Sequence, residues 1–323
     1  MVNLIYMKKD NLKILFIGAG NIASQHLKTL DSLIDLKNCW ISSRTSHKSK
    51  QLANLYSINH VEKNYYDFIK QNKKCIDGIF ILVSMDQIFI TSKKILKYKI
   101  PLFIEKPPGL DIKQLQELNF LSKKYKTSNL IGYNRRYYSV IQKVKKKLGS
   151  ENIISAHIEA HERYWILKNK VKKKSYLQKW IYANTSHVIN LLMFFLGNPK
   201  SVKTFSNNKF NIKNLRINTS AIIEFNKKIY VTFKSNWDVV GGWYIKIFSN
   251  KNTYLFSPLE QCVVTNKKFK STKIIPENYD KVYKAGFYSQ AVFFLNLIKK
   301  GNYYNDLKNI LSTYKLIKKI FKK

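Results

Sequence analysis

Glycines close to the N-terminus have the spacing of a phosphate-binding turn. Gly18 and Gly20 follow the apolar run 13–17, and Ala23 stands where such turns carry a third small residue. Gly18 permits a tight turn, Gly20 allows the backbone to approach a pyrophosphate, and Ala23 allows a helix to pack on the strand. Apolar residues recur at helical spacing over 22–34, so helix amides would face the phosphates. We expect a dinucleotide to contact Gly18, Gly20, Asn21 and Ile22.

The residues after the second predicted strand, 38–42, bear on the choice of dinucleotide. Folds that prefer NAD place an Asp or Glu here, about 20 residues after the glycines, to bind the ribose hydroxyls. This chain has Ser43 and Arg44, with Lys48 nearby. A hydroxyl and a guanidinium would bind a 2′-phosphate that a carboxylate would repel. We expect NADP(H) to be favoured over NAD(H); the alternative is that Arg44 is one more surface cation.

A lysine ends another predicted strand. Residues 78–83 predict a buried parallel strand that delivers Ser84, and the apolar run 100–104 delivers Glu105 and Lys106 to the sheet edge where ligands bind in open α/β folds. The two prolines that follow stop the strand and stiffen the turn. Such a lysine can move the proton of a carbinol if its pKa falls from about 10.4. The alternative is that Lys106 is a loop lysine among many.

Four segments, in this order, resemble the Gfo/Idh/MocA-type NAD(P)-dependent oxidoreductases. They are Gly18–Ala23, Glu105–Pro107, Gly132–Tyr137 and Asn184–Leu191, and the likeness extends over nearly all of the chain. The resemblance implies that Lys106 is the catalytic lysine near the nicotinamide and that His187 faces the substrate. It also implies a homo-oligomer, a dimer or tetramer, formed through the sheet of the second half.

The resemblance and the residues together give the expected site. The expected catalytic residues are Lys106 and His187. The expected cofactor-binding residues are Gly18, Gly20, Asn21, Ile22, Ser43, Arg44, Ser84 and Glu105. The expected substrate-binding residues are Asn134, Arg135, Arg163 and Asn184.

The chain departs from the family's pattern just before His187. Relatives usually carry an acid three or four positions earlier, where this chain has Ala183 and Asn184. An amide can hydrogen-bond a sugar hydroxyl, but it cannot stabilise a protonated Lys106 or His187. Because apolar residues follow His187, a core histidine is the alternative for that residue. A catalytically silent member that binds cofactor or sugar as a sensor is the alternative for the chain.

The second half predicts a sheet. Strands are expected at 153–165, 202–210, 217–226, 229–236 and 244–248, with a hairpin turn at 226–228 and closing helices at 288–298 and 307–321. The fold class is therefore α/β. We expect a Rossmann doubly wound parallel sheet over 1–132, and an α+β domain with a large, open, mostly antiparallel sheet over 133–323.

Three polar residues share one face of the strand expected at 153–165. His157, Glu159 and His161 alternate, so their side chains would line up. Ligands on one straight strand converge poorly on a metal, and no fourth ligand is evident. We expect a polar sheet face and no metal site. Arg163, which follows, could pair with a carboxylate or phosphate of the substrate.

Composition narrows the class of protein. The 323 residues are 45% hydrophobic and carry a formal charge of +39 from 58 Lys+Arg and 19 Asp+Glu. Lysine is spread along the chain, and arginine occurs only at 44, 135, 136, 163 and 216. Nucleic-acid readers cluster such charge, so binding to nucleic acid is a weaker alternative, and the field favours anionic small molecules instead.

Localisation signals are lacking. The three cysteines are far apart, which favours a reducing compartment over a disulfide framework. No apolar run reaches the about 20 residues of a membrane span, and residues 1–11 lack the order of a signal peptide. We expect a cytoplasmic, NADP-preferring oxidoreductase that acts on a sugar, a sugar derivative or a nucleotide sugar, with Lys106 as general acid/base assisted by His187.

Overall fold

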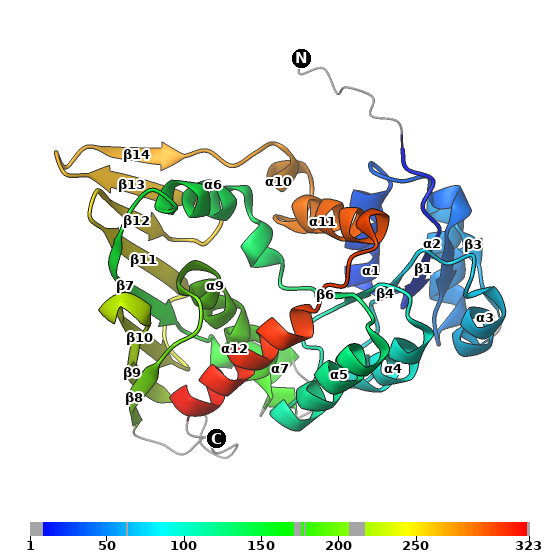
Figure 1. The fold of residues 1–323 in the computed structure, drawn as a ribbon, viewed down its shortest axis with the longest axis horizontal. Coiled ribbons are helices and arrows are strands. Elements are labelled where there is room, and N and C mark those ends of the chain that lie inside the picture. The colour runs from blue at the N-terminus through cyan, green and yellow to red at the C-terminus, as the bar shows by residue number, and fades with distance from the viewer. Residues whose placement is uncertain (1–8, 63, 171–175, 178, 207–216, 322–323) are drawn as a thin grey trace. The chain divides into compact units, whose positions relative to one another are not determined.

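A computed structural model describes residues 9–62, 64–170, 176–177, 179–206 and 217–321 (Figure 1). The chain forms two compact units. The first holds the described residues up to Gly132 together with Val282–Asn309, and the second holds Tyr133–Lys281 and the residues from Ile310 onward. The expected division of the chain was 1–132 and 133–323; in the structure the segment 282–309 packs with the first unit.

The first unit contains a six-stranded parallel sheet in the order β3-β2-β1-β4-β5-β6. Its strands are β1 (Ile14–Ile17), β2 (Trp40–Ser42), β3 (Asn59–His60), β4 (Gly78–Ile81), β5 (Leu102–Ile104) and β6 (Asn129–Ile131). The order reverses between β1 and β4, as in a doubly wound dinucleotide-binding sheet. β1, β4 and β5 are buried along their whole length, because helices cover both faces of such a sheet. The expected Rossmann sheet is confirmed.

Helices surround this sheet. They are α1 (Asn21–Leu30), α2 (Ser46–Tyr56), α3 (Tyr65–Asn72), α4 (Ile88–Ile95), α5 (Ile112–Tyr125) and α11 (Phe287–Lys300). α11 comes from far along the chain, yet its Phe294 packs edge-on against Phe80 of β4 and Phe103 of β5, at ring-centroid distances of 5.1 and 5.7 Å. Burial of these rings explains why the segment belongs to the first unit.

A buried imidazole and carboxylate link α1 to the end of β5. His26 Nε2 lies 2.8 Å from Glu105 Oε1, and both side chains are almost fully buried. The His26 ring stacks on Phe287 of α11 and meets Phe103 edge-on. The other oxygen of Glu105 accepts the backbone amide of Lys106 at 3.1 Å. The contact therefore fixes the helix that follows the glycine turn against the strand end that carries Lys106.

The second unit contains an eight-stranded sheet in the order β14-β13-β12-β11-β7-β10-β9-β8. Only β7 and β10 pair in parallel, so the expected mostly antiparallel sheet is confirmed. Its strands are β7 (Ile153–Ala160), β8 (Ser201–Ser206), β9 (Asn218–Glu224), β10 (Tyr230–Asn236), β11 (Trp243–Ser249), β12 (Asn252–Phe256), β13 (Cys262–Asn266) and β14 (Ser271–Ile274). The last three were not expected. The end of the strand expected at 202–210 lies outside the described residues.

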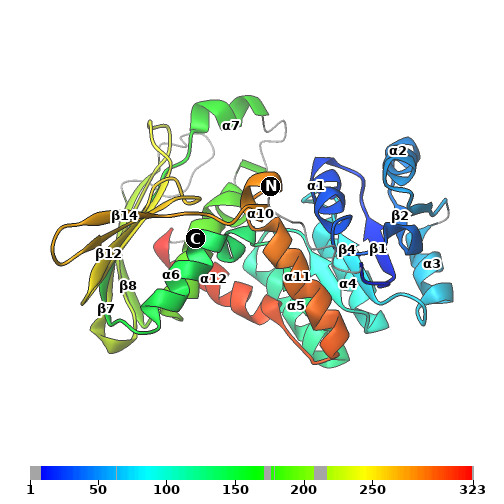
Figure 2. The same cartoon turned by 90° about the horizontal axis from the view of Figure 1, so that it is seen from above.

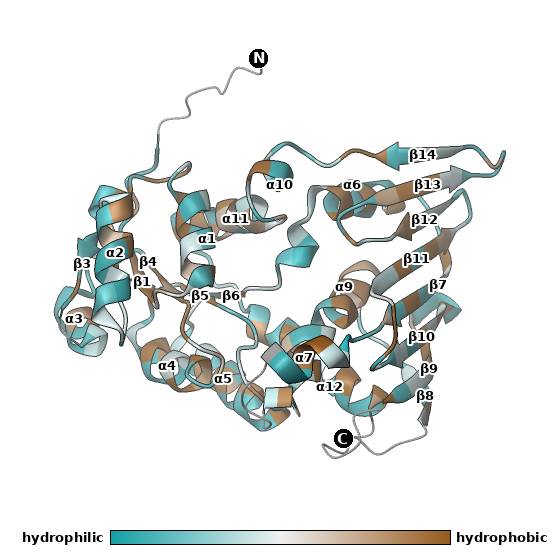
Figure 3. Ribbon diagram, turned by 180° about the vertical axis from the view of Figure 1, so that it is seen from behind, coloured by the Kyte–Doolittle hydropathy of each residue, from teal (hydrophilic) through white to brown (hydrophobic). Residues whose placement is uncertain are grey.

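Helices cover one face of this sheet. They include α6 (Ser139–Leu148), a π-helix (Ile181–Thr185), α9 (Ser186–Leu196) and α12 (Asp306–Ile320), and Figure 2 shows α6 and α12 on the same side of the strands. Hydrophobic and hydrophilic residues alternate along the strands (Figure 3). Ile158, Val231 and Ile245 are buried toward the helices, whereas Ile222 and Tyr230 are about half exposed on the other face.

Strand β7 ends earlier than the pattern indicates. It stops at Ala160, and residues 164–170 form the helix α7 (Tyr164–Lys170) rather than a continued strand. The reason lies in His161, whose Nδ1 accepts the backbone amide of Asn236 at 3.0 Å. A side chain thus takes the place of a ladder carbonyl, and regular pairing with β10 ends there.

Within the described residues, no helix combines the length and the apolar character that crossing a bilayer requires. Most of the N-terminal stretch 1–11, which predicted the lack of a signal peptide, lies outside the described residues.

We predict that His26→Ala destabilises the first unit. The substitution leaves the Glu105 carboxylate buried without its main side-chain partner, which costs about 1–3 kcal/mol, and it also removes an aromatic contact with Phe287. Gln25→Ala, at the exposed preceding position of α1, is the matched control and should unfold as the wild type does. Chemical denaturation of both variants checks this; equal midpoints would contradict it.

Candidate nucleotide and substrate sites

A cavity of about 670 Å³ lies at the carboxyl ends of β1, β2 and β4. Six of the expected cofactor-binding residues line it, namely Gly18, Gly20, Ile22, Ser43, Arg44 and Ser84. Asn21 and Glu105 are not among the lining residues. Asn21 is exposed at the start of α1, and the carboxylate of Glu105 is engaged with His26. The sheet edge at the reversal of strand order is where ligands bind in this architecture.

The two glycines of the turn differ in whether the fold leaves room for a side chain. Gly18 has a φ of +117°, and a Cβ there would lie 2.4 Å from the carbonyl oxygen of Leu82, so only glycine fits. A Cβ on Gly20 would meet no atom within 4 Å. The fold itself leaves room for a side chain at 20, and that space belongs to the cavity.

The loop after β2 carries the residues expected to read the ribose. The Ser43 hydroxyl donates to the carbonyl of Thr45 at 2.8 Å and lies 3.1 Å from the Ser49 hydroxyl. Arg44 is exposed, and no described residue forms an ion pair with it. The carboxylate in this lining belongs to Glu62, which pairs with Lys50 at 2.9 Å; that lysine lowers the pKa of Glu62.

Lys106 follows β5 directly and belongs to the first unit. It is half-buried, its peptide bond to Pro107 is cis, and it is not among the residues that line the 670 Å³ cavity. Its backbone is held by Glu105, as described above. The structure therefore fixes where the lysine leaves the sheet.

The second unit has a cavity of its own, of about 870 Å³. Three of the expected substrate-binding residues line it, namely Arg135, Arg163 and Asn184, whereas Asn134 is buried and is not among the lining residues. Trp180, Trp243 and the stretch 257–260 form much of the remaining wall. A volume of this order accommodates a small organic ligand.

Glu162 is a site residue that the sequence did not single out. It is 4% exposed and lines the 870 Å³ cavity. Its Oε1 accepts from Asn184 at 3.1 Å and from the Thr185 hydroxyl at 2.8 Å, while its Oε2 accepts from the Trp180 indole at 3.1 Å and from Asn184 at 3.0 Å. Burial raises the pKa of Glu162, and these donors oppose that rise. The carboxylate ties the end of β7 to the segment that leads into α9.

His187 occupies the first turn of α9 and is 2% exposed. Its ring lies edge-on to Tyr133 at 5.0 Å and faces Trp243 at 6.1 Å between centroids. The Tyr133 hydroxyl donates to Ser186 at 3.0 Å. The imidazole is thus held by an aromatic pair, and one member of that pair, Trp243, also lines the cavity.

Arg135 also contacts Trp243. Its guanidinium carbon lies 4.1 Å from the centroid of that ring, a cation–π distance. Burial lowers the pKa of Arg135, while Tyr138, Glu260 and Glu162 act in the opposite direction. Since an arginine does not deprotonate in proteins, the side chain remains a cation in the wall of the cavity.

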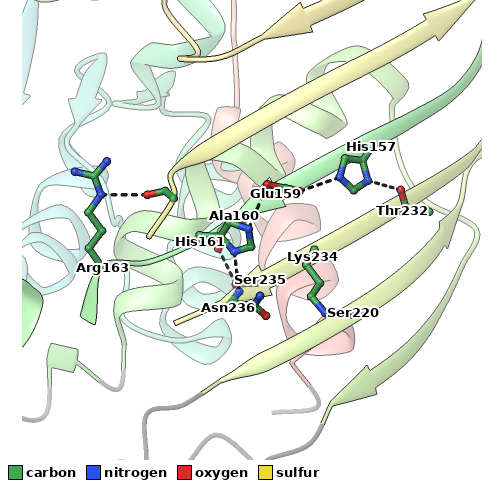
Figure 4. Close-up of polar contacts among 11 residues, drawn as sticks. His157, Glu159, Ala160, His161, Arg163, Ser220, Thr232, Lys234, Ser235 and Asn236 are labelled. Carbon is green, nitrogen blue, oxygen red and sulfur yellow. Dashed lines mark hydrogen bonds and ion pairs between the residues drawn. The ribbon is translucent and has the colours of Figure 1, made fainter. Parts of the chain in front are cut away.

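The polar row of His157, Glu159 and His161, on β7 and just after it, is a hydrogen-bonded chain (Figure 4). His161 receives a backbone amide at Nδ1, so its Nε2 carries the proton and faces Glu159 at 3.2 Å. His157 lies 3.3 Å from the other oxygen of Glu159 and 2.7 Å from the Thr232 hydroxyl. Both imidazoles point at one carboxylate, and among the described residues no group of His, Cys, Asp and Glu could hold a metal ion.

Comparison with known proteins bears on these sites. Residues 12–133 match the model of a family described as an oxidoreductase family with an NAD-binding Rossmann fold. The Rossmann part of the chain therefore matches the Gfo/Idh/MocA oxidoreductase family. The resemblance inferred from the sequence is confirmed. The match covers the glycine turn, Arg44 and Lys106, and it ends two residues before Arg135.

One curated relative and two solved structures illustrate the likeness. An uncharacterized oxidoreductase of Bacillus subtilis is 25% identical over 142 residues, which is 44% of this chain and 41% of the relative. A dehydrogenase from Chromobacterium violaceum superposes with a TM-score of 0.79 at 14% identity, covering 96% of this chain and 94% of that one. A UDP-N-acetylglucosamine 3-dehydrogenase from Acidithiobacillus ferrooxidans has a TM-score of 0.75 at 13% identity, with coverages of 96% and 97%. The two structures show that the whole fold is shared.

The glycine geometry makes a paired prediction about stability. Gly18→Ala forces a side chain into a positive φ and against Leu82, which costs about 1–3 kcal/mol for the backbone conformation alone. Gly20→Ala meets no atom and should change the free energy of unfolding by less than about 1 kcal/mol. Thermal and urea unfolding of the two variants test this. Equal losses of stability would show that position 18 is not sterically restricted.

Proposed function

We propose that this protein is an NADP-preferring oxidoreductase that interconverts an alcohol and a ketone on a sugar, a sugar derivative or a nucleotide sugar. The observation that carries the proposal is the cavity at the reversal of strand order, lined by Gly18, Gly20 and Arg44, in a domain of an NAD-binding oxidoreductase family. Support for the substrate class comes from the nucleotide-sugar dehydrogenase that shares the fold.

The residues present fit a dinucleotide phosphate. The open space at Gly20 would accept a pyrophosphate against the N-terminus of α1. Arg44 and Lys48 line the same cavity, and no carboxylate directly follows β2, so a 2′-phosphate would meet cations. Bound there, the nicotinamide supplies the hydride acceptor or donor for the reaction.

In this proposal Lys106 and His187 move the proton. Oxidation of a carbinol carbon releases the hydroxyl proton, and Lys106 Nζ accepts it; reduction returns the proton from the same atom. His187, held by Tyr133 and Trp243, orients the substrate hydroxyl or shares the proton. Glu162 supplies a carboxylate that Asn184 contacts directly, which favours an active enzyme over the catalytically silent sensor.

The proposal also covers the oligomeric state and the cellular location of the protein. We infer a homo-oligomer, a dimer or tetramer, through the open face of the eight-stranded sheet, where Phe205, Ile222 and Tyr230 are 61%, 48% and 51% exposed. We also infer that the enzyme is cytoplasmic and that it binds no nucleic acid. The second inference is supported by the spread of its basic charge along the chain.

Cofactor binding is predicted to separate from folding at two positions. Gly20→Ala should weaken NADPH binding by about tenfold or more without loss of stability, because its Cβ enters the space for the pyrophosphate. Arg44→Gln should raise the Kd for NADPH by about 10–100-fold and leave that for NADH unchanged. Fluorescence titration measures both, with the exposed Lys70→Gln as charge-matched control. Tighter NADH than NADPH binding by the wild type would refute the assignment of Arg44.

The proton role is predicted from Lys106→Ala. This variant should keep the wild-type Kd for NADPH and lose about 10²–10⁴ of turnover, because it lacks the amine that accepts the carbinol proton. Nicotinamide absorbance, followed over a panel of sugars, uronic acids and nucleotide sugars, gives turnover, and the exposed Lys113→Ala is the control. Full turnover by the variant would exclude the role of Lys106, whereas NADPH binding without turnover by the wild type would favour the silent sensor.

A further inference from the structure

The cavity of the second unit contains a buried hydrogen-bond donor, on Arg135, that the described chain does not satisfy. The Nε of Arg135 is buried and has no hydrogen-bond partner, and no described residue forms an ion pair with this guanidinium. The face of the group lies on the Trp243 ring, which does not accept a hydrogen bond in the plane of the guanidinium, so the Nε–H is left without an acceptor. An arginine presents its donors as a rigid fork.

The carboxylates of Glu162 and Glu260 in the same wall, by contrast, have hydrogen-bond donors. Glu162 accepts two side-chain contacts on each oxygen, from Trp180, Asn184 and Thr185. Glu260, which is exposed, accepts the Tyr138 hydroxyl at 3.0 Å. The protein thus provides donors for these acids. Of the two arginines in the wall, Arg163 donates from Nε to the carbonyl of Gly241 at 3.1 Å, whereas the Nε of Arg135 has no acceptor among the described residues.

We propose that the substrate carries an anionic group, a carboxylate or a phosphate, and that Arg135 binds it. This inference rests on the proposed function and names the substrate class for it. A planar carboxylate or a phosphate can accept two parallel N–H bonds from one guanidinium. A ligand of this kind supplies the acceptors that the wall around Arg135 lacks.

The position of Arg135 connects the anionic group to the proposed chemistry. Trp243 contacts the guanidinium on one side and lies 6.1 Å from the His187 ring, centroid to centroid. Arg135 and His187 therefore lie next to the same indole ring. With its anionic group on Arg135, a small hydroxylated ligand would extend toward Trp243 and His187. Binding at a group away from the reacting carbon can hold that carbon in the orientation that the reaction needs.

A structural role for Arg135 is the rival explanation. Burial lowers the pKa of Arg135, and Glu260 and Glu162 oppose that fall from a distance, so the cation could be balanced by these acids without any ligand. This rival predicts that charged and neutral sugars bind equally well, and the two explanations therefore differ in a measurable preference.

The test is calorimetric titration of the full chain, without dinucleotide, with glucose, glucuronate and glucose 6-phosphate at matched ionic strength. We expect at least one of the anions to bind about tenfold or more tightly than glucose. The better anion tells a carboxylate site from a phosphate site. Arg135→Gln should abolish the preference, and Arg135→Lys should keep a smaller one, because it retains the charge and loses the fork.

The control is Lys267→Gln, which removes one exposed positive charge on the turn between β13 and β14 and should leave the preference intact. Unfolding curves of each variant show whether it is folded. Equal binding of the three ligands, no binding of any, or a preference that survives Arg135→Gln would overturn the inference. Anion binding without turnover on any substrate would refute the proposed reaction and leave the anion site standing.

Discussion

The first unit depends on one buried contact between an imidazole and a carboxylate. His26 and Glu105 lie 2.8 Å apart in a setting of aromatic rings, where an unpartnered carboxylate would be expensive. The pair joins the helix after the glycine turn to the strand end before Lys106. The contact therefore fixes the position of the glycine turn relative to Lys106. His26 also stacks on Phe287, so α11, from late in the chain, packs against the same contact.

The second unit uses a carboxylate in a comparable way. Glu162, at the end of β7, receives the side chains of Trp180, Asn184 and Thr185 and so fixes the π-helix that precedes His187. The amide at position 184, which breaks the family's acidic pattern, donates to this acid. The carboxyl group that the family's pattern places before the histidine is thus provided in space by a residue that follows β7, and this carboxyl group lies in a buried wall where electrostatic interactions are stronger than in water.

The two cavities differ in what they offer a ligand. In the first, Arg44 is exposed and Gly20 leaves space, so binding there would rest on backbone amides and solvated cations. In the second, Arg135 is stacked on Trp243 and its Nε is shielded from water, so a partner would be desolvated and bound in a defined orientation. A large positive net charge acts on both at long range and is screened by salt, whereas the fork of one arginine discriminates at contact distance.

Local patterns in the sequence were enough to predict the parallel sheet, the glycine turn, the strand end at Glu105–Lys106 and the family. These features are set by neighbours in the chain, since strand periodicity and turn chemistry act over a few residues. The strands β12–β14, the early end of β7 and the role of Glu162 came only from the tertiary structure. Mixed polar residues such as Asn252 and Lys273 acquire a strand conformation from pairing with other strands. Likewise, no spacing along the chain relates Glu162 to Thr185, or Arg135 to Trp243, because such contacts exist only once the sheet has folded against its helices.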